Sequence, residues 1–281
     1  LGLQSDLRQA IEQGGLALFY QPKVDARTGE FTGAEALVRW QHAERGAVGA
    51  TELIAVAERF GLIGMVGEWV LDETCRQIRA WEIAGLRMRI AVNLSAHQLR
   101  QDDLVQRIRR TLKRHRVDAS LLTFEITESV AMEDTNATLR SFAQLARAGA
   151  SLAIDDFGTG HSSLAYLRTL PARQLKIDRS FVADLGVSGD AMAVVDAVIR
   201  LAHALGLRVV AEGVETERQR DILQTLGCDE FQGYLFARPM DADRLALWAA
   251  GEESTRLFVE KRAVPREPAP SVASGEPPTL Q

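Results

Sequence analysis

The amino-acid sequence predicts an α/β protein built as a TIM-like (β/α)8 barrel, and two observations support this prediction. Apolar, strand-like runs alternate with amphipathic segments along the whole chain, which is typical of a parallel sheet covered by helices. The number of strand-like runs, eight within about 250 residues, is typical of a closed barrel. The runs are residues 16–22, 31–40, 88–95, 121–129, 150–158, 174–182, 208–216 and 231–237.

The segments between these runs have the apolar spacing of helices. Several of them end in a glycine, which suits the C-terminus of a helix because it adopts a left-handed backbone without strain. The predicted helices are residues 51–61, 70–85, 104–115, 138–149, 191–206 and 218–227.

Length and composition are those of one large globular domain. The chain has 281 residues, of which 46% are hydrophobic and 25% charged, enough to bury a sizeable core. We assign residues 1–255 to the barrel and residues 256–281 to a C-terminal extension, which is rich in proline and serine and expected to be disordered from about residue 264. Because the chain begins at Leu1 rather than at a methionine, we expect it to be a piece of a longer protein.

Charge and cysteine content exclude several classes of function. A net charge of −5 argues against a broad basic surface for polymeric nucleic acid. Cys75 and Cys228 are too few for a disulfide framework or a thiolate metal cage, so both are expected to be buried. The fragment has no membrane segment or signal peptide, which predicts a cytoplasmic domain, while the full-length protein has room for a membrane anchor elsewhere.

Polar residues gather near the C-terminal ends of the strand-like runs. In a barrel these ends meet on one face, where enzymes of this architecture carry their chemistry. One such residue alone is explained by a solvated strand end, but a whole set inside apolar runs is not, because an unpaired buried charge is costly. The set is Glu35, Asn93, Glu125, Glu128, Asp155, Asp156, Lys176, Asp178, Glu212, Glu215 and Gln232.

Carboxylate and amide oxygens predict a site for Mg²⁺ or Mn²⁺, since no cysteine or histidine pair accompanies them. The adjacent Asp155 and Asp156 suggest two cations, with one carboxylate shared, as in two-metal phosphoester hydrolases. Side chains alternate along a strand, so we expect the turn "FGTG" at residues 157–160 to let Asp156 swing toward the site. Lys176 then supplies a fixed positive charge, and Glu212 accepts a proton or joins the second metal.

One rival motif is weak. "DFG" at residues 156–158 also occurs in protein kinases, but the glycine-rich loop and the strand lysine that a kinase needs are absent.

Eight motifs together resemble one family. "YQPKVD", "GAEALVRW", "NLS", "FEITES", "DDFGTG", "LKIDRSFV", "AEGVET" and "QGYLFARPM" stand in the order and spacing of the EAL domain, the bacterial phosphodiesterase that opens cyclic-di-GMP. The match covers roughly residues 8 to 250. The resemblance implies a barrel whose first strand runs antiparallel to the others.

The resemblance also implies roles for the site residues. It implies metal ligation by Glu35, Asn93, Glu125, Asp155, Asp156 and Glu212, with Asp155 shared between two metals. It implies catalytic roles for Glu35, Lys176, Glu212, Asp155 and Asp156. It implies substrate contacts at Gln21, Leu37, Arg39, Asn93, Asp178, Glu215 and Gln232. Glu128 corresponds to the glutamate that holds the loop after "DDFG", which lies at the family's dimer interface, so a homodimer is expected.

Departures from the family pattern leave the metal ligands intact. His161 stands where an aromatic residue is usual, Arg173 replaces a customary acidic residue, and the loop "GAVGATELI" lacks its common prolines. The first two lie on or near the dimer-linked loop and therefore bear on dimer strength and regulation.

Two hypotheses follow. The first is an active phosphodiesterase of bacterial signal transduction that converts cyclic-di-GMP to linear pGpG with Mg²⁺ or Mn²⁺, while Ca²⁺ binds without supporting turnover. The second is a degenerate EAL module that binds cyclic-di-GMP as a receptor. The complete carboxylate set favours the enzyme. We also expect an N-terminal regulatory domain that this fragment lacks.

Overall fold

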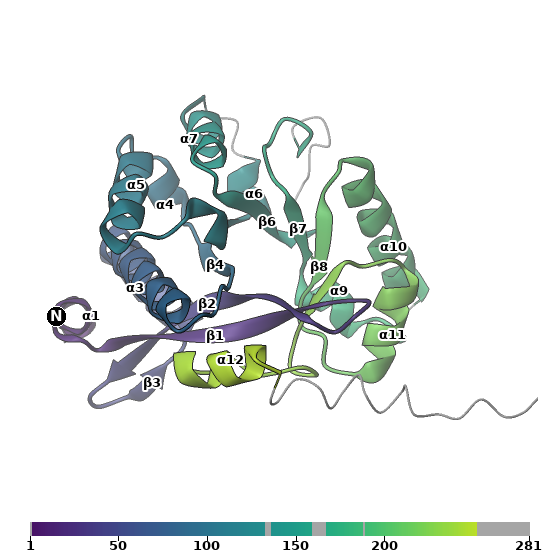
Figure 1. Ribbon diagram of the computed structural model, residues 1–281, viewed down its shortest axis with the longest axis horizontal. Helices are drawn as coiled ribbons and strands as arrows, with labels where there is room; N and C mark the ends of the chain where they lie inside the picture. Colours follow the sequence, from purple (N-terminus) through teal and green to yellow (C-terminus); the bar gives the residue numbers. More distant parts are fainter. Residues whose placement is uncertain (1, 133–135, 159–166, 188, 252–281) are drawn as a thin grey trace, which may run out of the picture.

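A computed structural model describes residues 2–132, 136–158, 167–187 and 189–251. The expected disordered extension and His161 lie outside the described residues. The central sheet of the structure is a barrel, which is closed by the pairing of β1 with both β2 and β9 (Figure 1). The barrel strands are β1 (Leu16–Asp25), β2 (Phe31–His42), β4 (Ile90–Asn93), β5 (Leu122–Thr127), β6 (Ser151–Phe157), β7 (Gln174–Ile177), β8 (Arg208–Ala211) and β9 (Glu230–Gln232). All eight predicted strands are therefore confirmed.

The first strand runs against its neighbours, as the resemblance implied. β1 pairs antiparallel with β2 and with β9, whereas the pairs from β2 and β4 round to β8 and β9 are parallel. In the β1–β2 register, Gln21 lies opposite Glu35 and Lys23 opposite Gly33. Residues two apart on a strand share a face, so β1 directs both Gln21 and Lys23 into the barrel.

A short strand that the sequence analysis did not predict forms after β2. β3 (Gly46–Val48) pairs antiparallel with the end of β2, where Val48 lies opposite Trp40. Three residues with one large apolar side chain carry no readable alternation, so the strand depends on pairing with β2 rather than on a sequence pattern of its own.

Helices surround the sheet, and the six predicted ones are present. They are α2 (Ala50–Arg59), α3 (Ile63–Ile83), α5 (Leu104–His115), α7 (Asn136–Arg147), α10 (Gly189–Ala204) and α11 (Glu217–Thr225). The further helical elements are α1 (Gly2–Gln13), α4 (Ala96–Leu99), η1 (Ala119–Leu121), α6 (Glu128–Ala131), α9 (Arg179–Ala183) and α12 (Ala242–Ala249). α12 lies against β1 (Figure 1), and its Trp248 ring meets the ring of Phe31, at the start of the neighbouring β2, edge to face at 5.9 Å.

The predicted strands at residues 174–182 and 208–216 are among those that end earlier than expected, and a polar residue caps a helix within each of these two ranges. Asp178 follows β7 and accepts the backbone N–H of Ser180 at 3.0 Å, which starts α9. Thr216 lies beyond the end of β8 and caps α11 through the N–H of Gln219 at 3.2 Å.

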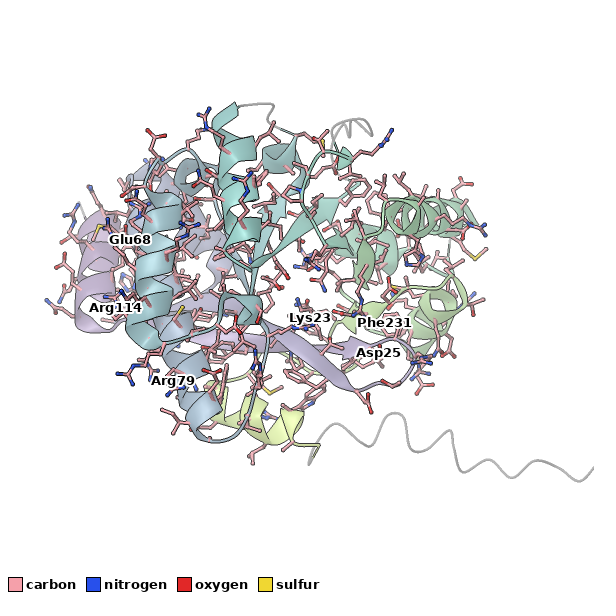
Figure 2. All side chains as sticks on the ribbon, turned by 45° about the horizontal axis from the view of Figure 1, so that its top comes forward. Lys23, Asp25, Glu68, Arg79, Arg114 and Phe231 are labelled. Atoms are coloured by element: carbon pink, nitrogen blue, oxygen red, sulfur yellow. The ribbon has the colours of Figure 1, made fainter. Side chains whose placement is uncertain are left out.

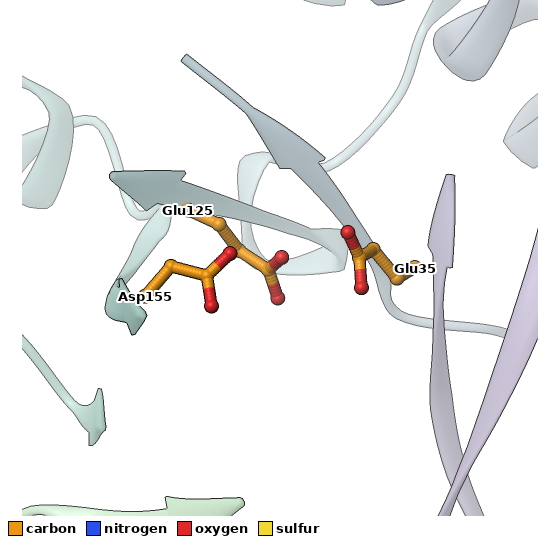
Figure 3. A group of neighbouring side chains, drawn as sticks. All are labelled: Glu35, Glu125 and Asp155. Atoms are coloured by element: carbon orange, nitrogen blue, oxygen red, sulfur yellow. The ribbon is translucent and has the colours of Figure 1, made fainter. Parts of the chain in front are cut away.

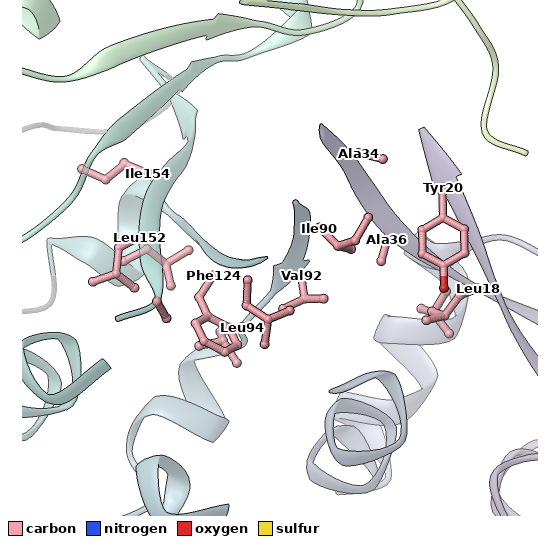
Figure 4. Packing of buried hydrophobic residues seen from close by; sticks show 14 of the residues in the cluster. Leu18, Tyr20, Ala34, Ala36, Ile90, Val92, Leu94, Phe124, Leu152 and Ile154 are labelled. Atoms are coloured by element: carbon pink, nitrogen blue, oxygen red, sulfur yellow. The ribbon is translucent and has the colours of Figure 1, made fainter. Parts of the chain in front are cut away.

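The hydrophobic core fills the layer between the barrel and its helices (Figure 4). Phe124 and Ile126 on β5 pack outward, and Glu125 between them faces the interior of the barrel by strand alternation. Tyr20 on β1 meets Trp81 on α3 edge to face at 5.1 Å. The core thus holds the strands while leaving the inner positions to polar groups.

Two expectations from composition are met. Cys75 and Cys228 are both buried and free. Among the described residues, no helix combines the length and the apolar character needed to cross a bilayer.

Candidate active site

Three carboxylates from different strands meet inside the barrel. Glu35 on β2, Glu125 on β5 and Asp155 on β6 bring one oxygen each within 4.8 Å of the others (Figure 3). All three are buried, and Glu125 is completely inaccessible. An ionised carboxylate in such a place needs positive charge beside it, and the three oxygens lie close enough together to share one cation.

A second group shares Asp155 with the first. Asp155, Asp156 and Glu212 also bring one oxygen each within 4.8 Å of one another. Asp156 reaches this side because the pairing of β6 with β7 is irregular between Ile154 and Phe157, and Asp156 adopts a left-handed backbone at φ +54°. The expected cause was wrong: the strand continues to Phe157, and the swing arises within it rather than in the following turn.

Lys176 provides the positive charge between the carboxylates. Its ammonium group is fully buried and lies 2.7 Å from Glu125 Oε2 and 2.7 Å from Glu212 Oε1. It also lies 3.2 Å from Asp155 Oδ2 and 3.3 Å from Glu35 Oε2. One lysine thus binds carboxylates from β2, β5, β6 and the segment after β8, and it supplies the positive charge that Asp155 needs beside Asp156.

Amide side chains orient Glu35. Asn93 on β4 donates to Glu35 Oε1 at 2.9 Å, and Gln232 on β9 donates to Glu35 Oε2 at 2.8 Å. Gln232 also donates to Gln21 Oε1 at 3.2 Å, and its own oxygen is buried without a hydrogen-bond partner among the described residues. An unpartnered buried oxygen costs free energy, so this one is available to a ligand.

The carboxylates differ strongly in pKa. Burial raises the pKa of Glu125 to about 7, with Glu35 adding to the rise and Lys176 opposing it. Burial also raises the pKa of Glu212 to about 8 against the pull of Lys176. For Glu35 burial is outweighed by Lys176 and by the hydrogen bonds from Gln232 and Asn93, which lower its pKa to about 2.

We therefore expect metal uptake to release protons. Glu125 and Glu212 have raised pKa values in the metal-free protein, so near pH 7 they are partly protonated, and a cation has to displace those protons. Affinity for Mn²⁺ should rise with pH through about 7 to 8, and binding at pH 7 should release about one proton. Calorimetry in two buffers of different ionisation enthalpy measures this number, and a binding enthalpy independent of buffer would contradict it.

The other predicted residues lie around this centre at different depths. Glu128 is buried at the start of α6 and accepts the N–H of Gly158 at 2.7 Å, so it holds the backbone directly after β6. Leu37 and Arg39 continue the face of Glu35 along β2, and Arg39 donates to the carbonyl of Val38 at 2.9 Å.

A cavity opens onto the centre, and it contains residues that the sequence analysis missed. Its predicted lining residues are Gln21, Glu35, Glu212, Glu215 and Gln232, and it is completed by Arg179, Gly213, Gly233 and Tyr234. Arg179 directly follows the predicted residue Asp178, and Tyr234 lies two positions after the predicted residue Gln232. This proximity in the sequence is the signal that could have found both. Leu37, Arg39 and Asp178 do not line this cavity.

Lys23 is a third missed residue. It lies on β1 two positions after Gln21 and reaches Glu125 Oε1 at 3.5 Å. A lysine inside the apolar run "LALFYQPKV", in step with Gln21, was the available signal.

The donor set fits hard divalent cations. Five carboxylates (Glu35, Glu125, Asp155, Asp156 and Glu212) face two ammonium groups, which leaves an excess of negative charge when all are ionised. Within the described ranges no histidine or cysteine joins these groups. Oxygen ligands of this kind favour Mg²⁺ or Mn²⁺ over Zn²⁺.

Comparison with known proteins defines the family. The family model described as the EAL domain matches residues 4–239. The chain is 49% identical over 246 residues to the bifunctional diguanylate cyclase/cyclic di-GMP phosphodiesterase MucR of Pseudomonas aeruginosa, covering 87% of this chain and 36% of MucR. It is 43% identical over 259 residues to the cyclic di-GMP phosphodiesterase NbdA of the same organism, covering 92% of this chain and 32% of NbdA.

A solved structure agrees with the fold. The PaMucR phosphodiesterase in complex with c-di-GMP superposes with a TM-score of 0.84 at 49% identity, covering 87% of this chain and all of that one. The chain belongs to the EAL domain family. It spans about a third of the length of the curated relatives MucR and NbdA.

Proposed function

We propose that this domain is a Mg²⁺- or Mn²⁺-dependent phosphodiesterase that hydrolyses cyclic-di-GMP to linear pGpG. The observation that carries the proposal is the intact pair of carboxylate groups that share Asp155 around Lys176. The names of MucR and NbdA and the c-di-GMP complex of PaMucR support the substrate.

Two sets of ligands would hold the cations. Glu35, Asn93, Glu125 and Asp155 form the first set, and Asp155, Asp156 and Glu212 form the second. When bound, the cations would supply Lewis acidity toward the phosphate and lower the pKa of a water molecule.

Two side chains of the centre would orient the attacking water, stabilise negative charge and accept a proton. Lys176 presents a fixed ammonium group that orients the attacking water and stabilises negative charge on the phosphate. Glu212 borders the cavity and is placed to accept a proton from that water. The proposed substrate contacts are Gln21, Leu37, Arg39, Asn93, Asp178, Glu215 and Gln232.

A direct assay tests the proposal. The fragment is incubated with cyclic-di-GMP and Mg²⁺, and the products are separated by chromatography. We expect pGpG in amounts that grow with time and vanish when a chelator removes the metal. Tight binding of cyclic-di-GMP without pGpG would instead support the receptor hypothesis, and neither binding nor cleavage would overturn the proposal.

Calcium should separate binding from turnover. Ca²⁺ takes about 6 to 8 oxygen ligands at 2.3 to 2.6 Å, whereas Mg²⁺ holds a tight octahedron at about 2.0 to 2.1 Å. We expect Ca²⁺ to bind and support cyclic-di-GMP binding, but to lower the rate at least about 100-fold, because the reacting groups are held out of line. Calorimetry with Ca²⁺ and the same product assay check this, and equal rates with both metals would contradict it.

Assembly and location belong to the same proposal. Glu128 holds the backbone at Gly158, where the loop linked to the family's dimer interface begins, which supports a homodimer. We place the domain in the cytoplasm, under the control of an N-terminal regulatory domain. Sedimentation of the fragment at several concentrations tests the dimer.

A further inference from the structure

Lys23 is the second buried cation of the barrel. Its side chain is 6% exposed, and Figure 2 places it in the middle of the molecule, whereas Arg79 and Arg114 lie on the helical periphery. Lys23 pairs with Gly33 on β2, which lies two residues before Glu35 and on the same inward face of the strand. The lysine therefore lies one layer beneath the mouth of the barrel and approaches Glu125 from below.

The contacts of Lys23 are few. Its Nζ lies 3.5 Å from Glu125 Oε1, and in the described part of the chain no other carboxylate lies within 4.0 Å of it. The second oxygen of Glu125 already has Lys176 at 2.7 Å. Glu125 is therefore bracketed by two ammonium groups, one shared with the other carboxylates and one of its own.

A buried ammonium group with a single long contact is costly to keep. What it offers is positive charge, because Lys176 already pairs with four carboxylates and a fifth, Asp156, belongs to the same centre. Neither Lys23 nor Lys176 lines the cavity to the centre, and Lys23 reaches one carboxylate where Lys176 reaches four. The position of Lys23 suits an electrostatic role toward Glu125 rather than contact with a substrate.

We propose that Lys23 is a positioning residue whose ammonium group is a permanent counter-charge beneath the metal centre. It holds Glu125 in place before a metal binds, and it lowers the affinity of the centre for divalent cations. This inference rests on the proposed metal centre. Its consequence is that occupancy follows the free metal concentration instead of saturating at trace levels.

The physical basis is competition between like charges for one carboxylate. A divalent cation on Glu125 is repelled by Lys23, so removing the lysine charge should strengthen metal binding. The same removal leaves Glu125 with less compensation in the metal-free protein, which should lower its stability. A residue with only a packing role would lower stability without raising metal affinity.

The test compares Lys23→Met with the wild-type fragment, using Mn²⁺ alone as the probe. We expect Lys23→Met to bind Mn²⁺ at least about tenfold more tightly in calorimetry at pH 8. Its metal-free melting temperature should fall by roughly 6 to 15 °C, and saturating Mn²⁺ should recover most of that loss. Lys23→Arg, which keeps the charge, should bind Mn²⁺ within about threefold of wild type.

Arg208→Met is the control for removal of one cation from beside a buried carboxylate, although the Arg208 side chain itself is half-exposed. Arg208 pairs at 3.2 Å with the buried Glu230, which belongs to neither carboxylate group. This variant should lose stability without any gain in Mn²⁺ affinity.

Each outcome decides the inference. Equal Mn²⁺ affinity in Lys23→Met and wild type would overturn it, as would tighter binding by Arg208→Met of the same size. If Lys23→Met folds only when Mn²⁺ is present, the inference is supported; if it folds in neither condition, the inference is wrong. A wild-type fragment that binds no Mn²⁺ contradicts the proposed metal centre itself, which keeps the two failures apart.

Discussion

Replacing Lys176 with methionine should abolish most turnover and destabilise the metal-free protein. The variant leaves Glu35, Glu125, Asp155 and Glu212 together without the ammonium group that lies 2.7 to 3.3 Å from each. Removing one partner of a buried charge pair costs about 3 to 5 kcal/mol. Turnover should fall at least about 100-fold, because a positioned donor near the reacting charge is lost.

Denaturant unfolding with and without Mn²⁺, together with the pGpG assay, measures both effects. Mn²⁺ should restore part of the stability of Lys176→Met, since the cations replace the missing positive charge, but it should not restore the rate. Lys113→Met is the control, because Lys113 is exposed on α5; it should leave both quantities unchanged. A Lys176→Met variant with wild-type turnover would remove this lysine from the mechanism.

Substitution of Asp155 and substitution of Asp156 should have different effects on metal binding. Asp155 belongs to both carboxylate groups and Asp156 only to the second. Asp155→Asn should therefore weaken the binding of both cations, whereas Asp156→Asn should keep one of them and still bind cyclic-di-GMP. Both variants should lose turnover by at least about 1000-fold, because activation of the water needs two cations.

The backbone makes this comparison clean. Asp155 Oδ1 accepts the N–H of Asp156 at 2.9 Å, and the amide oxygen of an asparagine can accept the same hydrogen bond. The unusual backbone at Asp156 should therefore persist in Asp155→Asn. Calorimetry with Ca²⁺ gives the stoichiometry, and the exposed Asp184 provides the control Asp184→Asn. Near wild-type cleavage by Asp156→Asn would exclude it as a ligand.

The barrel could be predicted because burial leaves a simple pattern in the sequence. Buried parallel strands read as apolar runs, and a carboxylate inside such a run, as in "LLTFEITES", is conspicuous because it needs a partner. The register that brings Glu35, Glu125 and Asp155 within 4.8 Å depends on closure of the sheet. Sequence patterning predicts a closed barrel from its eight strands but not the register between them, and the antiparallel first strand came from the family resemblance alone.

Other features could not be predicted because they depend on tertiary contacts. The left-handed backbone at Asp156 could not be predicted, because no glycine stands at this position. It accompanies the irregular pairing between β6 and β7. β3 exists only as a partner of β2. The role of Lys23 was hidden for a different reason, because one lysine in an apolar run also fits a strand edge, and only the closed barrel places it under Glu125.

The reversed direction of β1 also determines where the chain enters the barrel. Leu16, the first residue of β1, pairs with Trp40, five positions beyond Glu35 toward the mouth. In a barrel with only parallel strands the first strand would begin at the end of the barrel away from the site. Here α1 precedes a strand that begins at the same end as the site. From Leu16 the chain runs five residues to Gln21, which bonds Gln232 and through it Glu35. A pull on α1 along the strand axis would reach the metal ligands over this short path, without crossing the height of the barrel.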